Sequence, residues 1–258
     1  MSESPVPRVA VNGDFDGTWR LYVAALRRSW VPAALLALLW AGLLGWLMSS
    51  LNSQDGQDDI YLLIARVEAV LASANFWRVV LAACCVSTWL FCILIAIIHG
   101  VAVGAPIGLG AASVLALRSF PGALAAAAVY LALTTLGSLL FVVPGAWLWG
   151  MWQLWPVALI VERTGPSMSL ARSWVLMRQA WWSATTLTAV VTLAAVSIPL
   201  VCNAMGATLA MLAGADAQPA QYVALIALGT SAALTAPLLP AALVAVYVAQ
   251  LHRGASGV

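Results

Sequence analysis

The chain alternates long apolar runs with short polar segments that carry arginine. A bilayer core of about 30 Å is crossed by about 20 apolar residues in a helix. By that measure we expect six spans, at about 31–51, 79–103, 121–143, 146–161, 183–212 and 222–250, with a tight turn at Pro144-Gly145 before the short fourth one. A polar tail, 1–17, precedes a single helical membrane domain, 18–258. The pattern predicts an all-α, polytopic membrane protein with about six transmembrane helices.

The segments before and between the spans have the pattern of amphipathic helices at a membrane surface. In residues 18–30, apolar and aromatic side chains recur at helical spacing while the arginines fall mostly on the other side. Segments 104–120 and 164–182 also carry arginine beside apolar residues. We expect their apolar faces in the acyl boundary and their guanidinium groups near lipid phosphates. Residues 60–76 are interpreted as a further interfacial helix on the opposite surface, with a spanning helix as the alternative.

Composition supports this class of protein. The chain is 64% hydrophobic and only 8% charged, whereas soluble domains are about 25% charged. The net charge of +2 is too small to indicate nucleic-acid binding. No apolar run follows the start of the chain closely enough for a signal peptide, so a cleaved leader is not expected.

The arginines indicate the orientation. With six spans, nine of the eleven basic residues fall on the side that holds both termini, and most acids fall on the other side with Arg66 and Arg78. Because cytoplasmic loops carry the excess of positive charge, both termini are predicted to be cytoplasmic. The residues that we expect near headgroups or a partner protein on that side are Arg27, Arg28, Arg118, Glu162, Arg163, Arg172 and Arg178. Glu162 and Arg163 are adjacent and are expected to satisfy each other.

No pattern in the chain indicates catalysis or a metal. Intramembrane chemistry needs ionisable groups in the core of the bilayer, and the predicted spans place none near the midplane. No Ser-His pair, His-Glu-x-x-His motif, paired carboxylates or phosphate-binding glycine loop is present. The cysteines lie in apolar runs without spaced ligands and are interpreted as packing residues: Cys84, Cys85, Cys92 and Cys202. We therefore expect no cofactor, no metal and no enzyme activity.

A tryptophan cluster marks the predicted fourth span: Trp147, Trp149, Trp152 and Trp155. Tryptophan near a membrane surface usually belongs to an aromatic belt. Four in nine positions exceeds what anchoring needs, so a lipid-facing or ligand-facing aromatic wall is a second hypothesis.

Polar and kinking residues within the spans form a second group of candidates. Gln153 and Asn203 are predicted to bond across helices and fix their register, or else to line a polar path. Packing is favoured for Asn203, because Pro199 frees a carbonyl that it can satisfy. Together with Pro237 and Pro240, these two residues form a candidate kink or gate.

Similar short segments precede three of the predicted helix pairs. Residues 26–32 resemble residues 117–121, and residues 176–182 form a looser third copy. This indicates three units, each an interfacial helix followed by a helical hairpin. The alternative is that a membrane interface selects arginine and aromatic residues before any span.

A longer pattern resembles a known family. Within about forty residues the chain has, in order, Pro144-Gly145, Pro156, Val161-Glu162-Arg163, Gly165-Pro166, Ala171-Arg172-Ser173-Trp174-x-Leu176 and Trp181-Trp182. The pattern is similar to the membrane domain associated with glycerophosphoryl diester phosphodiesterases and to stand-alone bacterial inner-membrane proteins built from it. The resemblance implies a helical fold of about six spans in the inner membrane. It does not imply phosphodiesterase activity, which in that family belongs to a separate soluble domain.

The function expected from these features is non-enzymatic. The first hypothesis is a role in membrane or envelope lipid homeostasis, or as a scaffold for a partner, with membrane lipids bound at the cytoplasmic face. The alternative is a permease-like subunit of a transporter driven by a separate ATPase, in which segments 104–120 and 162–181 would be coupling surfaces. An intramembrane enzyme is disfavoured because the core lacks charge.

Overall fold

The computed structural model describes residues 15–51, 74–178, 181–212 and 217–256, and every secondary-structure element in these ranges is a helix. The helices are α1 (Phe15–Leu51), α3 (Ala74–Ala102), α4 (Leu109–Leu140), α5 (Val142–Trp152), α6 (Trp155–Val161), α7 (Pro166–Met177), α8 (Trp181–Leu212), α9 (Ala217–Thr235) and α10 (Leu238–Ser256). The prediction of an all-α, polytopic membrane protein is confirmed. The predicted interfacial helix at 60–76 lies outside the described residues except for its last three, which belong to α3.

Five stretches of the described residues are long and apolar enough to cross a membrane: Phe15–Leu43, Val80–Ala102, Leu109–Leu140, Trp181–Leu209 and Ile226–Arg253. The expected span at 146–161 is not among them, because the chain there forms two short helices, α5 and α6. At 1.5 Å per residue, neither approaches the thickness of about 30 Å that a span must cover. The six residues from Trp155 to Ile160 are all buried in the protein, so α6 is a core element.

Pro156 explains the break between α5 and α6. Proline has no N–H, and its ring clashes with the carbonyl four residues earlier. That carbonyl belongs to Trp152, the last residue of α5. A fully buried helix and a membrane span are both continuous apolar runs, so the pattern of the sequence did not distinguish them.

Ser173 of α7 supplies hydrogen-bond partners to two backbone groups at this break. Its hydroxyl donates to the Met151 carbonyl at 3.0 Å and accepts from the Leu154 N–H at 3.1 Å. Helix ends leave such groups without partners. Ser173 is fully buried, so it ties α7 to both short helices.

We expect Ser173→Ala to lower the free energy of unfolding by about 1.5 kcal/mol, because a buried carbonyl and a buried N–H lose their partner. Thermal unfolding in detergent, followed by tryptophan fluorescence, measures this. Ser113→Ala is the control, since that hydroxyl bonds only to a carbonyl of its own helix, Leu109. Equal midpoints for the two variants would contradict the bridging role.

Several boundaries differ from those predicted. The turn before α5 lies at Phe141, whose backbone is extended, and Pro144-Gly145 sits in the first helical turn, where proline is tolerated. Segment 18–30 is continuous with the first span in α1, and α4 likewise runs through Pro121. The predicted span at 222–250 is two helices, α9 and α10, separated at Ala236-Pro237. The helix expected within 164–182 is confirmed as α7.

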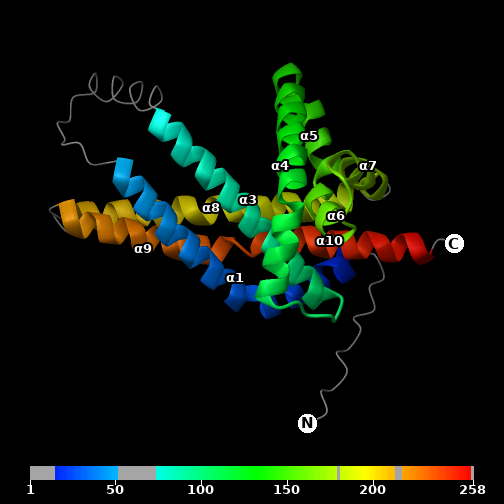
Figure 1. Cartoon of the computed structure of the whole chain (residues 1–258), viewed down its shortest axis with the longest axis horizontal. Helices are drawn as coiled ribbons and strands as arrows, with labels where there is room; N and C mark the ends of the chain where they lie inside the picture. Colours follow the sequence, from blue (N-terminus) through cyan, green and yellow to red (C-terminus); the bar gives the residue numbers. More distant parts are fainter. Residues whose placement is uncertain (1–14, 52–73, 179–180, 213–216, 257–258) are drawn as a thin grey trace, which may run out of the picture.

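The helices form three hairpins that meet at a common core (Figure 1). The hairpins are α1–α3, α4–α5 and α8–α9, whose members pack together. The buried core includes α6 and α10, one side of α7 and the parts of α1, α3, α4 and α8 that pack against them. In Figure 1 the α4–α5 hairpin runs across the direction of the α8–α9 hairpin. Three hairpins match the three units inferred from the sequence, although their relation as true repeats stays a prediction.

Five crossings would place the two ends of the described chain on opposite sides of a membrane, but the α4–α5 hairpin changes this count. Segments 110–122 and 159–166 line one cavity, so the chain leaves along α4 and returns through α5 and α6 to where it started. The remaining candidates, in α1, α3, α8 and α9–α10, are four in number. Four crossings and one out-and-back hairpin are compatible with both ends of the described chain on one side of a membrane, and the cytoplasmic side stays a prediction.

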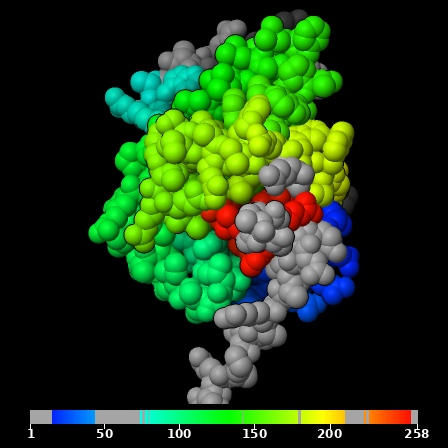
Figure 2. Space-filling model, turned by 90° about the vertical axis from the view of Figure 1, so that its right-hand side faces the viewer, coloured from blue at the N-terminus to red at the C-terminus, as the bar shows by residue number. Residues whose placement is uncertain are grey.

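One face of the molecule gathers the arginine-bearing ends. Figure 2 shows the start of α1, the start of α4, helix α7 and the end of α10 side by side on this face. The long hairpins α1–α3 and α8–α9 extend away from it in Figure 1. Both segments predicted to be cytoplasmic, 104–120 and 162–181, therefore lie near the two ends of the described chain.

Gln153 bonds across helices, as predicted. It is buried, its side-chain oxygen accepts from the Thr188 hydroxyl of α8, and its nitrogen lies 3.7 Å from the Met177 sulfur. Asn203 does not do so, because its amide donates at 2.8 Å to the Pro199 carbonyl in its own helix and the side chain is exposed. A proline in a helix frees the carbonyl four residues before it, not its own carbonyl. The Asn203 amide therefore does not bond to the freed carbonyl, contrary to the prediction.

Candidate functional site

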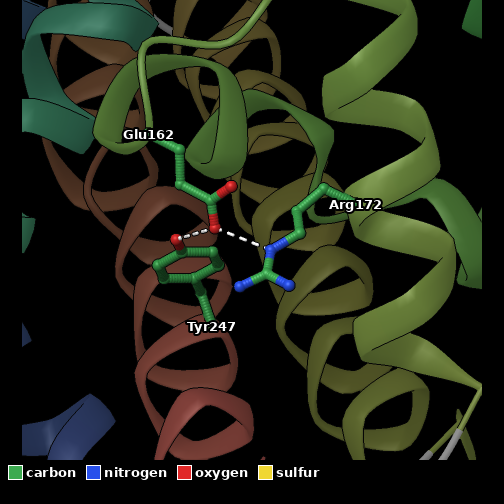
Figure 3. Close-up of polar contacts among 3 residues, drawn as sticks. All are labelled: Glu162, Arg172 and Tyr247. Carbon is green, nitrogen blue, oxygen red and sulfur yellow. Dashed lines mark hydrogen bonds and ion pairs between the residues drawn. The ribbon is translucent and has the colours of Figure 1, made fainter.

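A charged cluster joins three elements of the core. One carboxylate oxygen of Glu162 accepts from the Tyr247 hydroxyl at 2.7 Å and from the Arg172 Nε at 2.8 Å (Figure 3). Glu162 is the C-cap of α6, Arg172 comes from α7 and Tyr247 from α10. The ring of Tyr247 also meets that of His99 of α3 edge-on, at 6.3 Å between centroids. The expectation that Glu162 pairs with its neighbour Arg163 is wrong.

The backbone after Glu162 explains why the neighbours separate. Arg163 has a φ of 53°, in the left-handed region, where side chains other than glycine are strained. This conformation turns the chain from α6 into α7, whose N-cap is Gly165 and whose first residue is Pro166. As a result, Glu162 points to α10 while Arg163 borders a cavity on the α4 side.

This cavity, which we call the arginine cavity, has a volume of about 550 Å³ and lies between α4 and the α6–α7 turn. Arg118 and Ser119 of α4 face it from one side, and Arg163 and Thr164 of the turn from the other. Arg118 and Arg163 are exposed. Apolar residues of α4, such as Val114 and Leu115, line the rest. Ligand sites of proteins have volumes of about 300–1,000 Å³, so the cavity can hold a small polar group.

Among the described residues, the positive charge at the lining of the arginine cavity has no acidic partner. Its described lining includes no acidic residue. The ion pairs found among the described residues are Arg20–Asp16 and Arg172–Glu162, so neither involves Arg118 or Arg163. The Thr164 hydroxyl oxygen is shielded from solvent and has no hydrogen-bond partner in the described structure. Two free guanidinium groups and an unpaired hydroxyl at one cavity fit an anion.

Arg163→Gly tests whether this residue is kept for its charge. We expect the free energy of unfolding to stay the same or rise by up to about 1 kcal/mol, because glycine relieves the left-handed backbone. Arg118→Gly, which removes the same charge from a helix interior, is expected to cost about 1 kcal/mol. Chemical denaturation in detergent measures both. A clear loss of stability in Arg163→Gly would show that its side chain serves the fold.

The tryptophan cluster does not form one wall. Trp155 is buried against Tyr130, with 6.3 Å between ring centroids, so it cannot face lipid. Trp149 is half-buried. Trp147 and Trp152 both contact a fifth tryptophan, Trp174 of α7, with ring centroids 5.0 and 6.1 Å apart. The hypothesis therefore survives only for the part of the cluster nearest α7.

That part borders a second cavity, of about 750 Å³, on the other side of α7. Trp147, Trp174, Trp181 and Trp182 line it together with Arg178 and Arg253. The end of α10 thus lies near the end of α7 and the start of α8, which again brings together residues predicted for one side of the membrane.

The other candidate residues lie apart from these cavities. Arg27 and Arg28 are exposed on α1 and border a shallow hollow beside Trp19. Pro199 is half-buried within α8. Pro237 and Pro240 are buried, and the break between α9 and α10 lies at Pro237, as expected of a kink.

Four residues of these cavities and of the charged cluster were not among the predicted site residues: Ser119, Thr164, Trp174 and Tyr247. Ser119 belongs to the repeated segment 117–121 and Trp174 to the family-like pattern, but neither was assigned a role. Each is an ordinary residue of its segment, and only the fold places it beside an arginine, a tryptophan or Glu162. The one available signal was position, since Ser119 follows Arg118 and Thr164 follows Arg163.

No group of three or more potential metal ligands occurs among the described residues. The chain matches no protein-family model, and comparisons with curated proteins and with solved structures found no similar chain.

Proposed function

We propose that this chain is a non-enzymatic membrane protein that holds anionic phospholipid at its arginine-bearing face and serves membrane or envelope lipid homeostasis. The observation that carries the proposal is the arginine cavity, where Arg118 and Arg163, 45 positions apart in the sequence, face one hollow without an acid. Free guanidinium groups beside apolar helices suit the boundary between headgroups and acyl chains.

The location proposed is the bacterial inner membrane, with both termini and the arginine cavity on the cytoplasmic side. Two features support it: the excess of arginine on one predicted side, and the convergence of the α1, α4, α7 and α10 ends on one face (Figure 2). Juxtamembrane arginines gain about 1 kcal/mol each near an anionic leaflet. Membership of the membrane-domain family named above stays a prediction.

The permease-like alternative is less well supported by α7. A coupling surface must be free to meet a partner, but Ser169, Ser173 and Met177 of α7 are buried against the rest of the chain. Arg172, which was predicted to contact headgroups or a partner protein, instead forms an ion pair with Glu162. The exposed side of α7, which includes Met168 and Val175, is open to a partner in a scaffold role or in a coupling role, so only the loss of Arg172 to this ion pair counts against coupling.

Native mass spectrometry of the protein purified in mild detergent tests the proposal. We expect anionic phospholipid to remain bound to the wild-type chain and to be lost from the double variant Arg118→Gln/Arg163→Gln. The control is Arg78→Gln, which removes one charge near the start of α3; in Figure 1 this end of α3 lies away from α4 and α6, whose residues line the cavity. A stoichiometric ATPase in the preparation, with no bound lipid, would favour the transporter subunit and contradict the lipid-binding role.

A further inference from the structure

We propose that the arginine cavity is a site for a phosphate monoester, and specifically for a lipid whose headgroup ends in one. This inference rests on the proposed function and narrows it from anionic lipids in general to one class of headgroup. The argument uses the number of donors at the cavity, its net charge and the surface that adjoins it.

The donors at the cavity outnumber what a phosphodiester can accept. Arg118 and Arg163 each present a planar fork of N–H groups, and the hydroxyls of Ser119 and Thr164 add two more donors. A phosphodiester has two non-bridging oxygens, whereas a monoester has three terminal ones. Guanidinium forks bind phosphate oxygens in pairs, so two forks and two hydroxyls are satisfied best by three oxygens.

The charge of the two arginines at the cavity also favours a phosphate monoester over a diester. Two guanidinium groups that no described acid pairs with carry a charge of two, and a phosphate monoester carries about −1.5 to −2 at pH 7. A diester carries a single negative charge and would leave one guanidinium uncompensated.

The first turn of α7 adds to the positive potential. Gly165 caps this helix without a side-chain hydrogen bond, and Gly165 and Pro166 both line the cavity. The first turn of a helix carries a partial positive charge, which favours an anion at that end; Pro166 itself has no N–H to donate, so α7 contributes through this field. The Thr164 hydroxyl lies next to Gly165 in the sequence, is shielded from solvent and has no hydrogen-bond partner among the described residues.

The surroundings favour a lipid over a free phosphate. Val114 of α4 lines the cavity and is 52% exposed, and Leu117, beside Arg118, is 64% exposed. An acyl chain can follow this aliphatic face of α4 away from the headgroup and bury it, which is favourable by the hydrophobic effect. A soluble phosphate would leave the face uncovered.

Lipid titration by native mass spectrometry tests the inference. The probes are phosphatidic acid, which ends in a monoester, and phosphatidylglycerol, a diester with the same acyl chains. We expect wild-type protein to bind phosphatidic acid about ten-fold more tightly, since one further charge-assisted contact is worth about that factor. Arg118→Gln and Arg163→Gln should each bring the ratio close to one, and Thr164→Val, which keeps the shape of the side chain, should lower it in part. Arg78→Gln should leave it unchanged.

The outcomes separate the two proposals. Equal affinity of the wild-type chain for both lipids would overturn the monoester assignment and leave the anionic-lipid role intact. If neither lipid binds, both proposals fail. Glycerol 3-phosphate and inorganic phosphate serve as competitors: displacement of phosphatidic acid at equal concentration would keep the monoester chemistry and replace the lipid with a soluble source. A preference that survives in Arg118→Gln/Arg163→Gln would show that the lipid binds elsewhere.

Discussion

Gly145→Ala should destabilise the protein by about 3 kcal/mol, because overpacked helix contacts cost about that much. A Cβ at Gly145 would lie 2.1 Å from the Ser138 Oγ, 2.7 Å from the Ser138 N and 2.8 Å from its Cα. The hydroxyl can rotate away, but the backbone atoms of α4 cannot. The α4–α5 hairpin therefore has to open. Thermal unfolding and resistance to proteolysis in detergent measure the effect.

Gly42→Ala is the matched control for this prediction. It places the same methyl group in another apolar helix, α1, where nothing lies within 4 Å. Alanine is a better helix former than glycine, so we expect a gain of up to about 1 kcal/mol. In the double variant Gly145→Ala/Ser138→Gly only the side-chain clash is removed, and stability should return in part. Full stability of Gly145→Ala would mean that α4 and α5 do not approach as described.

Glu162→Gln should lower the free energy of unfolding by about 2 kcal/mol, the second largest effect that we expect. The carboxylate accepts two hydrogen bonds, one of them from a guanidinium group, and bonds to charged groups contribute about 1.5–3 kcal/mol. The side chains of Arg172 and Glu162 are 40% and 25% exposed, so solvent screening places the loss in the lower part of that range. Chemical denaturation of the detergent-solubilised protein measures it.

A double-mutant cycle with Tyr247→Phe resolves the cluster. The single Tyr247→Phe change should cost about 1 kcal/mol, and the double variant should cost less than the sum, because the two side chains share one bond. Asp16→Asn is the control: its ion pair with Arg20 is exposed, at 3.2 Å within one helix, and should contribute almost nothing. Additive costs in the cycle would refute the coupling of α6 with α10.

The position of most helices could be predicted from the sequence, but few of the residues at which they begin and end could be. Apolar runs located α3 and α8 to within a few residues, because a span must be long and uncharged whatever its neighbours are. Prolines were poor guides to helix ends. Pro32 and Pro121 stand at the predicted starts of two spans but lie inside α1 and α4, whereas Pro156, inside a predicted span, lies in the first turn of α6 just after α5 ends. Whether a proline starts, kinks or breaks a helix depends on which neighbours satisfy the freed carbonyl.

The arginines of the candidate site could be predicted from the sequence one by one, but not which of them lie together. Arg118 and Arg163 were both expected near headgroups from their positions in the chain. That they share a cavity depends on the return of α5 and α6 along α4, which no local pattern encodes. Glu162 was assigned to the wrong arginine for a similar reason, since adjacency in sequence says little about side chains at a turn with a left-handed residue.

The most direct test of the account is an experimental structure of the protein in a bilayer that contains anionic lipid. The account predicts density for a phosphate group between the guanidinium groups of Arg118 and Arg163, with an acyl chain along the exposed face of α4. The same experiment on Arg118→Gln/Arg163→Gln should show the headgroup gone and the helices unmoved. If the wild-type cavity holds only water, or if either arginine pairs with an acid of the same chain, the proposed lipid site is wrong.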